Sequence, residues 1–268
     1  NDPVFAQKLA SLADVYVNDA FGASHRAHAS TVGVANYLPA VAGFLLEKEV
    51  STLQRLIEEP ERPFVALLGG NKVSDKIGVI ENFLDFVDAI LTGGGMCFTF
   101  LKAKGINVGN SILQDEELGH CSKMLEKAKE KGREILIPVD VVVADKFSED
   151  ANYKVVSVDE IPDDWMGLDI GPKTISLYKD KIKNARTIFW NGPMGVFEMT
   201  PFSGGTKAIA EALANSGATT IVGGGDSDAA LRKYNLEDKI TFISTGGGAS
   251  LSLLEGTPLP GVKALLDR

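Results

Sequence analysis

"FVALLGGNKVSDKIGVI", residues 64–80, is the stretch that decides the fold. A continuous apolar run is followed at once by Gly69 and Gly70, and a helical pattern begins soon afterwards. Uninterrupted apolar runs are typical of strands that are covered on both faces in a parallel sheet. The stretch therefore predicts one strand–turn–helix unit of an α/β protein.

The same order recurs along most of the chain. Further strand-like apolar runs lie at 88–91, 134–144, 185–190, 219–222 and 240–244. Helical patterns lie between many of them, at 76–87, 97–105, 115–132 and 205–217. This alternation predicts a doubly wound, mostly parallel α/β sheet with right-handed crossovers, as in a Rossmann-like nucleotide-binding domain.

The first part of the chain has a different pattern. A helix-like stretch at 2–13 is followed by a short strand at 15–21 and a polar loop at 22–30. A long amphipathic helix follows, in which Leu46, Val50, Leu53 and Ile57 form one apolar stripe.

We interpret the chain as four successive parts. They are a remnant of a first α/β lobe at 1–40, an interdomain helix at 41–60, the nucleotide-binding domain at 61–252 and a C-terminal segment at 253–268.

Composition excludes several classes of protein. The net charge of −9 disfavours non-specific binding of nucleic acid, and no apolar run is long enough to span a membrane. Cys97 and Cys121 have neither metal-ligand nor redox spacing, and three histidines are too scattered for a metal site. These features predict a cytoplasmic protein with buried, reduced thiols.

Four predicted strands end in glycine clusters, at 69–70, 93–95, 223–225 and 246–248. Ligands of open α/β sheets bind beyond the carboxyl ends of the strands, where glycine lets the backbone approach them closely. A single cluster is usually only a tight turn, but four at one edge favour a phosphate-rich ligand. The P-loop and dinucleotide fingerprints are both absent, so a standard P-loop protein or a nicotinamide dehydrogenase has little support.

Charged residues beside these glycines suit phosphates. Lys72 and Lys76 would share one face if their segment were helical, and two ammonium groups suit two successive phosphates. The alternative is a pair of solvated lysines. Arg26, in a small basic loop, suits a second anionic substrate, although an ordinary surface loop is at least as well supported.

Two further stretches suggest how a nucleotide would be held. In IFWNGPMGVFE, residues 188–198, Pro193 and Val196 would form an apolar wall for a base, and Glu198 would bind ribose hydroxyls. In TTIVGGGDSDAA, residues 219–230, Asp226 would act through Mg²⁺ or cap a helix. Asp228 would favour the helix dipole and point away from the nucleotide.

Seven longer motifs, in series through most of the chain, resemble those of the phosphoglycerate kinase family. They are VNDAFGASHRAHAS (17–30), GGNKVSDKI (69–77), GGGMCFTFLKA (93–103), MGLDIGP (166–172), FWNGPMGVFE (189–198), GGGDS (223–227) and STGGGASL (244–251). The resemblance implies a two-lobed glycolytic kinase. It would transfer a phosphoryl group reversibly between 1,3-bisphosphoglycerate and ADP, giving 3-phosphoglycerate and ATP, with Mg²⁺.

The resemblance also implies roles for single residues. Arg26 is similar to an arginine that binds phosphoglycerate, and Lys72 to the lysine that follows the phosphoryl group in flight. Amides that meet the transferring group are implied at Gly246, Gly247 and Gly248. Nucleotide contacts are implied or expected at Lys76, Gly94, Gly95, Gly171, Pro193, Glu198, Gly224, Gly225, Asp226 and Ser227, with Asp226 also the metal-linked acid.

The match has departures. The family has more of the first lobe upstream, including most of its basic acceptor site, and this chain begins too late to contain it. Asn71, Asp228 and Ser252 stand where the family usually has Ala, Ala and Glu. The alternative to a kinase is therefore a nucleotide-binding fragment without turnover. Small-molecule substrates and a monomeric parent protein are expected, with no nucleic acid or membrane partner.

Overall fold

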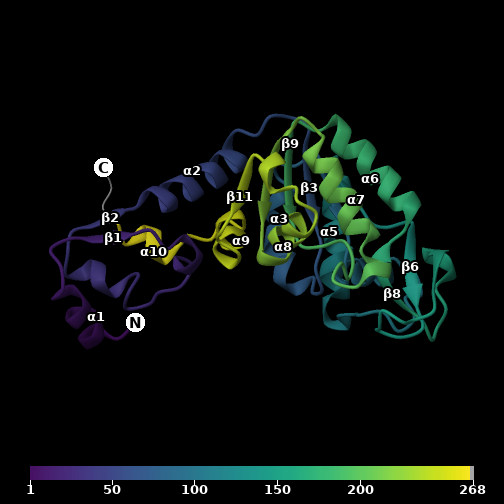
Figure 1. Ribbon diagram of the computed structural model, residues 1–268, viewed down its shortest axis with the longest axis horizontal. Helices are drawn as coiled ribbons and strands as arrows, with labels where there is room; N and C mark the ends of the chain where they lie inside the picture. The colour runs from purple at the N-terminus through teal and green to yellow at the C-terminus, as the bar shows by residue number, and fades with distance from the viewer. Residues whose placement is uncertain (266–268) are drawn as a thin grey trace. The chain divides into compact units, whose positions relative to one another are not determined.

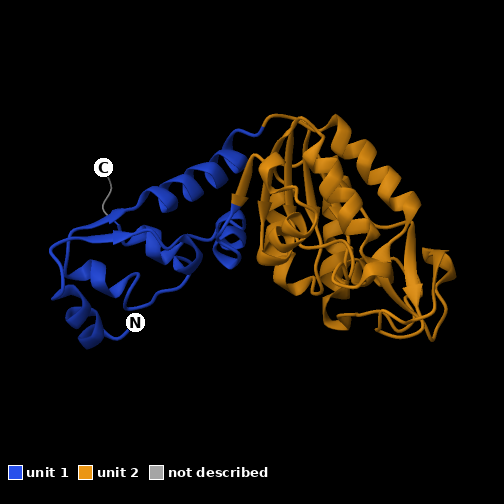
Figure 2. Ribbon diagram, viewed as in Figure 1, with its two compact units in different colours: residues 1–60, 244–268 blue, residues 61–243 orange. Residues whose placement is uncertain are grey.

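The computed structural model describes residues 1–265, which form two compact units (Figures 1 and 2). Unit 1 contains Asn1–Pro60 and the described part of Ser244–Arg268, and unit 2 contains Glu61–Ile243. The predicted interdomain helix lies in unit 1, as do residues 244–252, which we assigned to the nucleotide-binding domain. The last three residues of the predicted C-terminal segment lie outside the described residues.

A six-stranded sheet forms the centre of unit 2 (Figure 1). Its order is β11 (Phe242–Ser244), β10 (Thr219–Gly223), β9 (Thr187–Asn191), β3 (Phe64–Leu68), β4 (Ala89–Thr92) and β5 (Glu134–Leu136). Every pair from β10 to β5 is parallel. The predicted α/β class is confirmed, and the strand order reverses between β3 and β9.

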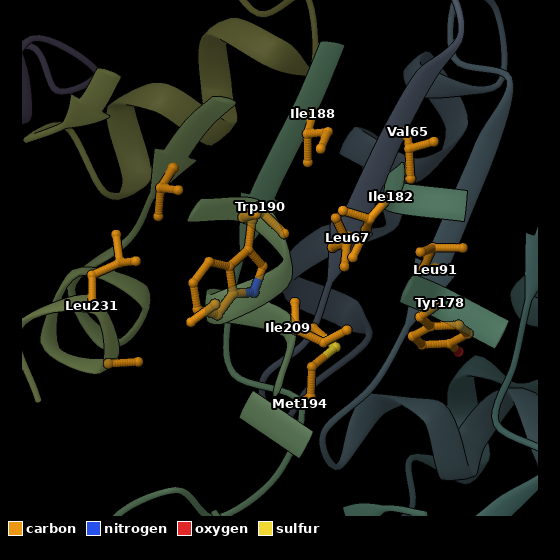
Figure 3. Close-up of a cluster of buried hydrophobic side chains, with 14 of the residues drawn as sticks. Val65, Leu67, Leu91, Tyr178, Ile182, Ile188, Trp190, Met194, Ile209 and Leu231 are labelled. Atoms are coloured by element: carbon orange, nitrogen blue, oxygen red, sulfur yellow. The ribbon is translucent and has the colours of Figure 1, made fainter. Parts of the chain in front are cut away.

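Helices cover both faces of this sheet. They are α3 (Ile77–Phe83), α4 (Met96–Ala103), α5 (Leu118–Glu130), α6 (Pro172–Asn184), α7 (Gly204–Ala214) and α8 (Gly225–Lys233). Residues of α6, α7 and α8 pack on one face, over Val65, Leu67 and Trp190 (Figure 3). On the other face, the ring of Phe83 in α3 packs against Phe64 and Phe189. The sheet is therefore wound on both sides, as a buried parallel sheet requires.

A second sheet of three antiparallel strands corrects one prediction. Residues 134–144, expected to form one strand, form β5 and β6 (Asp140–Ala144) in different sheets. Pro138, which has no N–H to donate, lies between them. The other strands of this sheet, β7 (Tyr153–Ser157) and β8 (Met166–Ile170), flank β6 and were not predicted.

Helix α6 was also missed, although its sequence carries the usual signals. Pro172 stands at its first turn, and Thr174, Tyr178 and Ile182 recur at intervals of four on its buried face. The buried Asp140 carboxylate accepts the Thr174 backbone N–H at 2.8 Å and so caps the helix.

Unit 1 is built from α1 (Pro3–Ala10), α2 (Phe44–Glu58), α9 (Gly248–Leu254), α10 (Pro260–Lys263) and the parallel pair β1 (Tyr16–Asn18) and β2 (Ala40–Ala42). Asn18 is buried and donates to Ser24 Oγ at 3.1 Å and to the Gly261 carbonyl at 3.0 Å. This side chain therefore joins β1, the following loop and α10.

The apolar stripe of α2 was predicted only in part. Leu46 and Leu53 are buried, but Val50 and Ile57 are half-buried, and the rest of the fully buried face is formed by Glu49 and Leu56. A buried glutamate is not visible to an apolar periodicity, because the pattern assigns every carboxylate to the solvent face.

Candidate functional site

Unit 2 contains a cleft of about 630 Å³ where the turns after β3, β4 and β9 meet β8. Its lining residues are Gly70, Asn71, Gly94, Gly95, Asn110, Ile112, Phe147, Met166, Gly167, Leu168, Pro193, Gly195, Val196, Glu198, Met199 and Asp226. Because β3 and β9 are the strands between which the order reverses, the cleft occupies the usual ligand position of an open α/β sheet.

Main-chain groups form the floor of this cleft. The Gly70 N–H donates to the Pro193 carbonyl at 3.0 Å, and the Gly94 N–H donates to the Met194 carbonyl at 2.9 Å. Gly94 has a φ of +63°, and a Cβ there would lie 2.6 Å from the Gly70 nitrogen. Only glycine fits this position, so the turns pack together without intervening side chains.

Lys72 and Lys76 do not share a helix face, because the chain is not helical at Lys72. Lys72 is exposed and precedes the short 3₁₀ turn Ser74–Lys76, while α3 begins only at Ile77. Lys76 is buried, and its ammonium nitrogen lies 3.9 Å from the position a Cβ on Gly70 would take. Burial lowers the pKa of Lys76, while the charges of Asp75 and Asp226 partly oppose this shift. An anion beside Lys76 would favour its charged form.

The stretch 223–228 is a strand end followed by an open helix start. Gly224, at a φ of +93°, precedes α8, and the first N–H groups of a helix have no intrahelical acceptor. Gly225 and Asp226 are exposed, whereas the buried Ser227 hydroxyl accepts the Gly192 N–H at 2.7 Å. The start of α8 thus presents N–H groups and a positive dipole end that suit an anion.

The two acids of α8 have different surroundings. Asp226 lines the cleft, while Asp228 does not and instead pairs with Arg232, one turn later, at 3.1 Å. Within residues 1–265, no cluster of three or more His, Cys, Asp or Glu side chains could hold a metal ion. A single exposed carboxylate at a helix start that suits an anion fits Mg²⁺, which commonly uses one or two carboxylates together with substrate phosphates.

The MGLDIGP motif contributes Met166, Gly167 and Leu168 to the cleft lining. Gly171, the glycine that the resemblance implies as a nucleotide contact, is buried at the start of α6 against the Asp140 carboxylate. Its role stays a prediction. Asn110, Ile112, Phe147 and Met199 were missed because they lie outside the glycine clusters.

The remaining predicted residues lie in unit 1, where Arg26 and the 246–248 cluster approach each other. The Arg26 guanidinium donates to His25 Nε2 at 3.2 Å, and that nitrogen lies 3.3 Å from the position of a Cβ on Gly248. Gly246 is buried, and its N–H donates to Ser244 Oγ at 3.2 Å. Unit 1 therefore holds a basic loop beside an open glycine turn.

Glu49 fixes the start of that turn and was not predicted. Its carboxylate accepts the Thr245 N–H at 2.7 Å, the Thr245 hydroxyl at 2.8 Å and the Ser244 hydroxyl at 2.7 Å. These bonds satisfy a carboxylate that has no solvent exposure.

Comparisons with known proteins agree with the motifs. The family model for phosphoglycerate kinase matches residues 1–257. The phosphoglycerate kinase of Rubrobacter xylanophilus is 59% identical over 268 residues, which cover all of this chain and 68% of that protein. This chain belongs to the phosphoglycerate kinase family.

Other members of the phosphoglycerate kinase family support the same assignment. The cytosolic phosphoglycerate kinase of Nicotiana tabacum is 59% identical over 271 residues, covering all of this chain and 68% of that protein. The phosphoglycerate kinase structure from Coxiella burnetii superposes with a TM-score of 0.92 at 48% identity, covering 98% of this chain and 68% of that one. The prediction of a phosphotransferase enzyme of this family is confirmed, and its substrates are small molecules.

Proposed function

We propose that the unit 2 cleft binds ADP or ATP and that the chain carries the nucleotide side of the phosphoglycerate kinase reaction. This reaction transfers a phosphoryl group between 1,3-bisphosphoglycerate and ADP, giving 3-phosphoglycerate and ATP. One observation carries the proposal: the cleft at the reversal of strand order combines an apolar wall with an open helix N-terminus and the exposed Asp226.

The lining residues suggest how the nucleotide is oriented. The base packs against Pro193 and Val196, and the exposed Glu198 accepts hydrogen bonds from the ribose hydroxyls. The phosphates meet the N–H groups at the start of α8, close to Gly70 and the buried Lys76. This arrangement places the apolar part of the ligand on side chains and its charged part on backbone amides.

Asp226 is the residue that would hold Mg²⁺ with the nucleotide phosphates. The bound ion supplies positive charge that offsets the charge of the phosphate oxygens during transfer. Asp226 provides a carboxylate that lines the cleft, and the Lys76 ammonium, close to Gly70, adds a positive charge that interacts with Asp226.

We assign Lys72, Gly246–Gly248 and Arg26 to the transferred group and the second substrate. Lys72 is exposed at the end of the turn after β3, where it is free to follow a moving phosphoryl group. The amides of Gly246–Gly248 suit the oxygens of that group, and Arg26 suits a phosphoglycerate anion. Phosphoryl transfer requires little more than such positioning and charge neutralisation.

Lys72→Ala tests the enzyme assignment. We expect coupled turnover of 3-phosphoglycerate and ATP to fall by at least about 100-fold, because a charge that acts in the transition state is lost. The Kd for ADP, measured by calorimetry, should stay within about three-fold, since the lost charge is assigned to the transition state. Lys183→Ala, which removes an exposed lysine from α6, is the matched control and should change neither quantity.

The competing hypothesis is a nucleotide-binding fragment. ADP binding by the unsubstituted chain without turnover would support that hypothesis and contradict the enzyme assignment for this chain. Equal losses of binding and turnover in Lys72→Ala would contradict the assigned role of Lys72.

We also propose that the protein acts as a monomer in the cytosol. Two relatives, from Nicotiana tabacum and Arabidopsis thaliana, are named cytosolic. Within residues 1–265 no helix has the length and apolar character to cross a membrane. Light scattering after size-exclusion chromatography tests the oligomeric state, and a mass of two chains would contradict it.

A further inference from the structure

Asp169 is a buried carboxylate directly behind the cleft. It follows Leu168 in β8, is only 4% exposed and does not line the cleft itself. One carboxylate oxygen accepts the Gly205 N–H, in the first turn of α7, at 2.7 Å. The other accepts the Ile170 N–H at 2.9 Å. Asp169 therefore joins a cleft-lining strand to the start of α7.

The same carboxylate supports the turn that forms one wall of the cleft. A Cβ placed on Gly195 would overlap the Asp169 carboxylate, so this turn rests directly on it. Two further bonds complete the support. The Val196 N–H donates to the Leu168 carbonyl at 2.8 Å, and the Met194 N–H donates to the Thr206 hydroxyl at 3.0 Å. The turn 193–196, which carries the proposed base-binding wall, thus depends on β8 and on α7.

No cation balances this carboxylate in the part of the chain that the structure describes, since none of the ion pairs within residues 1–265 includes Asp169. The negative charge of Asp169 acts on two ionisable side chains, Cys97 in α4 and Tyr234 at the end of α8. Glu198 and Glu211 in turn face Tyr234. On β6 its partner is the apolar Val142. Lys233, next to Tyr234, donates to the Phe197 carbonyl at 2.6 Å and is not paired with Asp169. The groups that interact with the Asp169 carboxylate are therefore neutral or acidic.

Burial raises the pKa of Asp169 to about 7, although the N–H groups of Gly205 and Ile170 partly oppose the shift. Protonation would replace one acceptor oxygen by an O–H donor. Because both oxygens already accept backbone N–H groups, the protonated acid would lose or weaken one of these bonds.

We propose that Asp169 is a positioning residue whose ionised form holds the turn 193–196 in its nucleotide-binding shape. Protonation releases the bond to Gly205 or to Ile170, and the wall formed by Pro193 and Val196 loosens. The inference rests on the proposed nucleotide site and adds a dependence of that site on proton concentration.

Adenosine is the probe that tests this proposal. It reaches the apolar wall but has no phosphate, whose own titration near neutral pH would confuse a measurement with ADP. Calorimetry on the full chain should show adenosine affinity falling about five-fold or more between about pH 8.5 and about pH 5.5. Carbon-13 NMR of the labelled Asp169 carboxyl should titrate over the same range.

Asp169→Asn mimics the protonated acid. We expect weak adenosine binding that no longer changes with pH. Asp140→Asn is the matched control, because Asp140 is also buried and also accepts N–H groups at a helix start, but does not line the cleft. It should lower thermal stability and leave the pH dependence of binding intact.

Adenosine affinity that is constant with pH in the unsubstituted chain would overturn the inference even if Asp169→Asn fails to fold. A pH profile in Asp169→Asn identical to that of the unsubstituted chain would overturn it as well. Absence of adenosine and ADP binding at every pH would instead refute the proposed nucleotide site, and the inference with it.

Discussion

The two units bury their apolar residues very differently. Unit 2 buries a central sheet on both faces, with Trp190, Phe64 and Phe189 almost fully excluded from solvent. Unit 1 has a two-stranded sheet, and more than half of the exposed large apolar side chains among the described residues lie within residues 1–45, including Leu12 and Phe44. Besides its buried apolar residues, unit 1 has buried polar side chains, such as Asn18 and Glu49, that join its elements. The candidate nucleotide cleft therefore lies on a packed core, whereas a buried hydrogen-bond network contacts the glycine turn of unit 1.

The largest expected effect is on the core of unit 2. Trp190→Ala removes a fully buried ring and the bond from its indole N–H to the Gly192 carbonyl, at 2.7 Å. We expect the free energy of unfolding to fall by about 3–5 kcal/mol, because a large cavity is left. Urea unfolding followed by circular dichroism measures it. Leu177→Ala, at a half-exposed position of α6, should cost less than about 0.5 kcal/mol.

The second prediction concerns the polar network of unit 1. Glu49→Ala leaves the Thr245 N–H and the Thr245 hydroxyl without their acceptor, which should cost about 2–3 kcal/mol. Hydrogen exchange should accelerate at residues 244–250. Glu47→Ala, at an exposed position of the same helix, is the control. Similar exchange in the two variants would show that packing, rather than this network, holds the turn.

The third prediction concerns the pH dependence that Asp169 gives to unit 2. Because the pKa of Asp169 is raised in the folded state, its ionisation opposes folding. The protonated side chain stabilises the folded state. This stabilisation is complete below the pKa of Asp169 in the unfolded chain and is lost as the pH rises through about 7. Asp169→Asn should therefore gain stability relative to the unsubstituted chain between about pH 4 and about pH 7, by at most about 1.4 kcal/mol per pH unit.

Thermal unfolding of both chains over this range measures that difference. A constant difference would show that Asp169 has an ordinary pKa in the folded chain. Stability and adenosine affinity should change in opposite directions with pH, which separates global unfolding from local positioning.

The smallest expected effect is on the exposed apolar residues of unit 1. Leu12→Ser combined with Phe44→Ser should change the free energy of unfolding by less than about 0.5 kcal/mol per site. It should clearly reduce the fluorescence of an apolar dye such as ANS, because two of the most exposed apolar side chains are removed. Val155→Ser with Leu177→Ser is the matched pair in unit 2, and an equal reduction there would remove the contrast between the units.

The sequence predicted the features that follow from hydrophobicity and missed those that follow from burial of polar groups. Continuous apolar runs located β3, β4, β9 and β10, because a strand covered on both faces must be apolar throughout. β8 was not predicted, because Gly167 and Asp169 interrupt its short apolar pattern. The buried Asp169 and Glu49 were invisible for a related reason: only the folded chain shows which N–H and O–H groups offset their burial.

The sequence also predicted only part of the candidate site: the glycine turns, but not the side chains that other segments contribute. Glycine clusters identified the turns after β3, β4 and β10, since these turns need close backbone approach. The side chains contributed by Ile112 and Phe147 come from segments without any phosphate signal, and only the fold brings them to the cleft. Lys72 and Lys76 do not share a helix face because Lys72 precedes the 3₁₀ turn Ser74–Lys76 and lies outside α3.

The main-chain floor of the cleft has a consequence for engineering the protein. Its shape is specified by backbone bonds among the turns at 69–71, 93–95 and 192–195 rather than by replaceable side chains. Attempts to alter ligand preference should therefore leave these turns untouched and vary the rim, at Ile112, Phe147 and Met199. Libraries restricted to such positions would sample new specificities while keeping the foundation of the site unchanged.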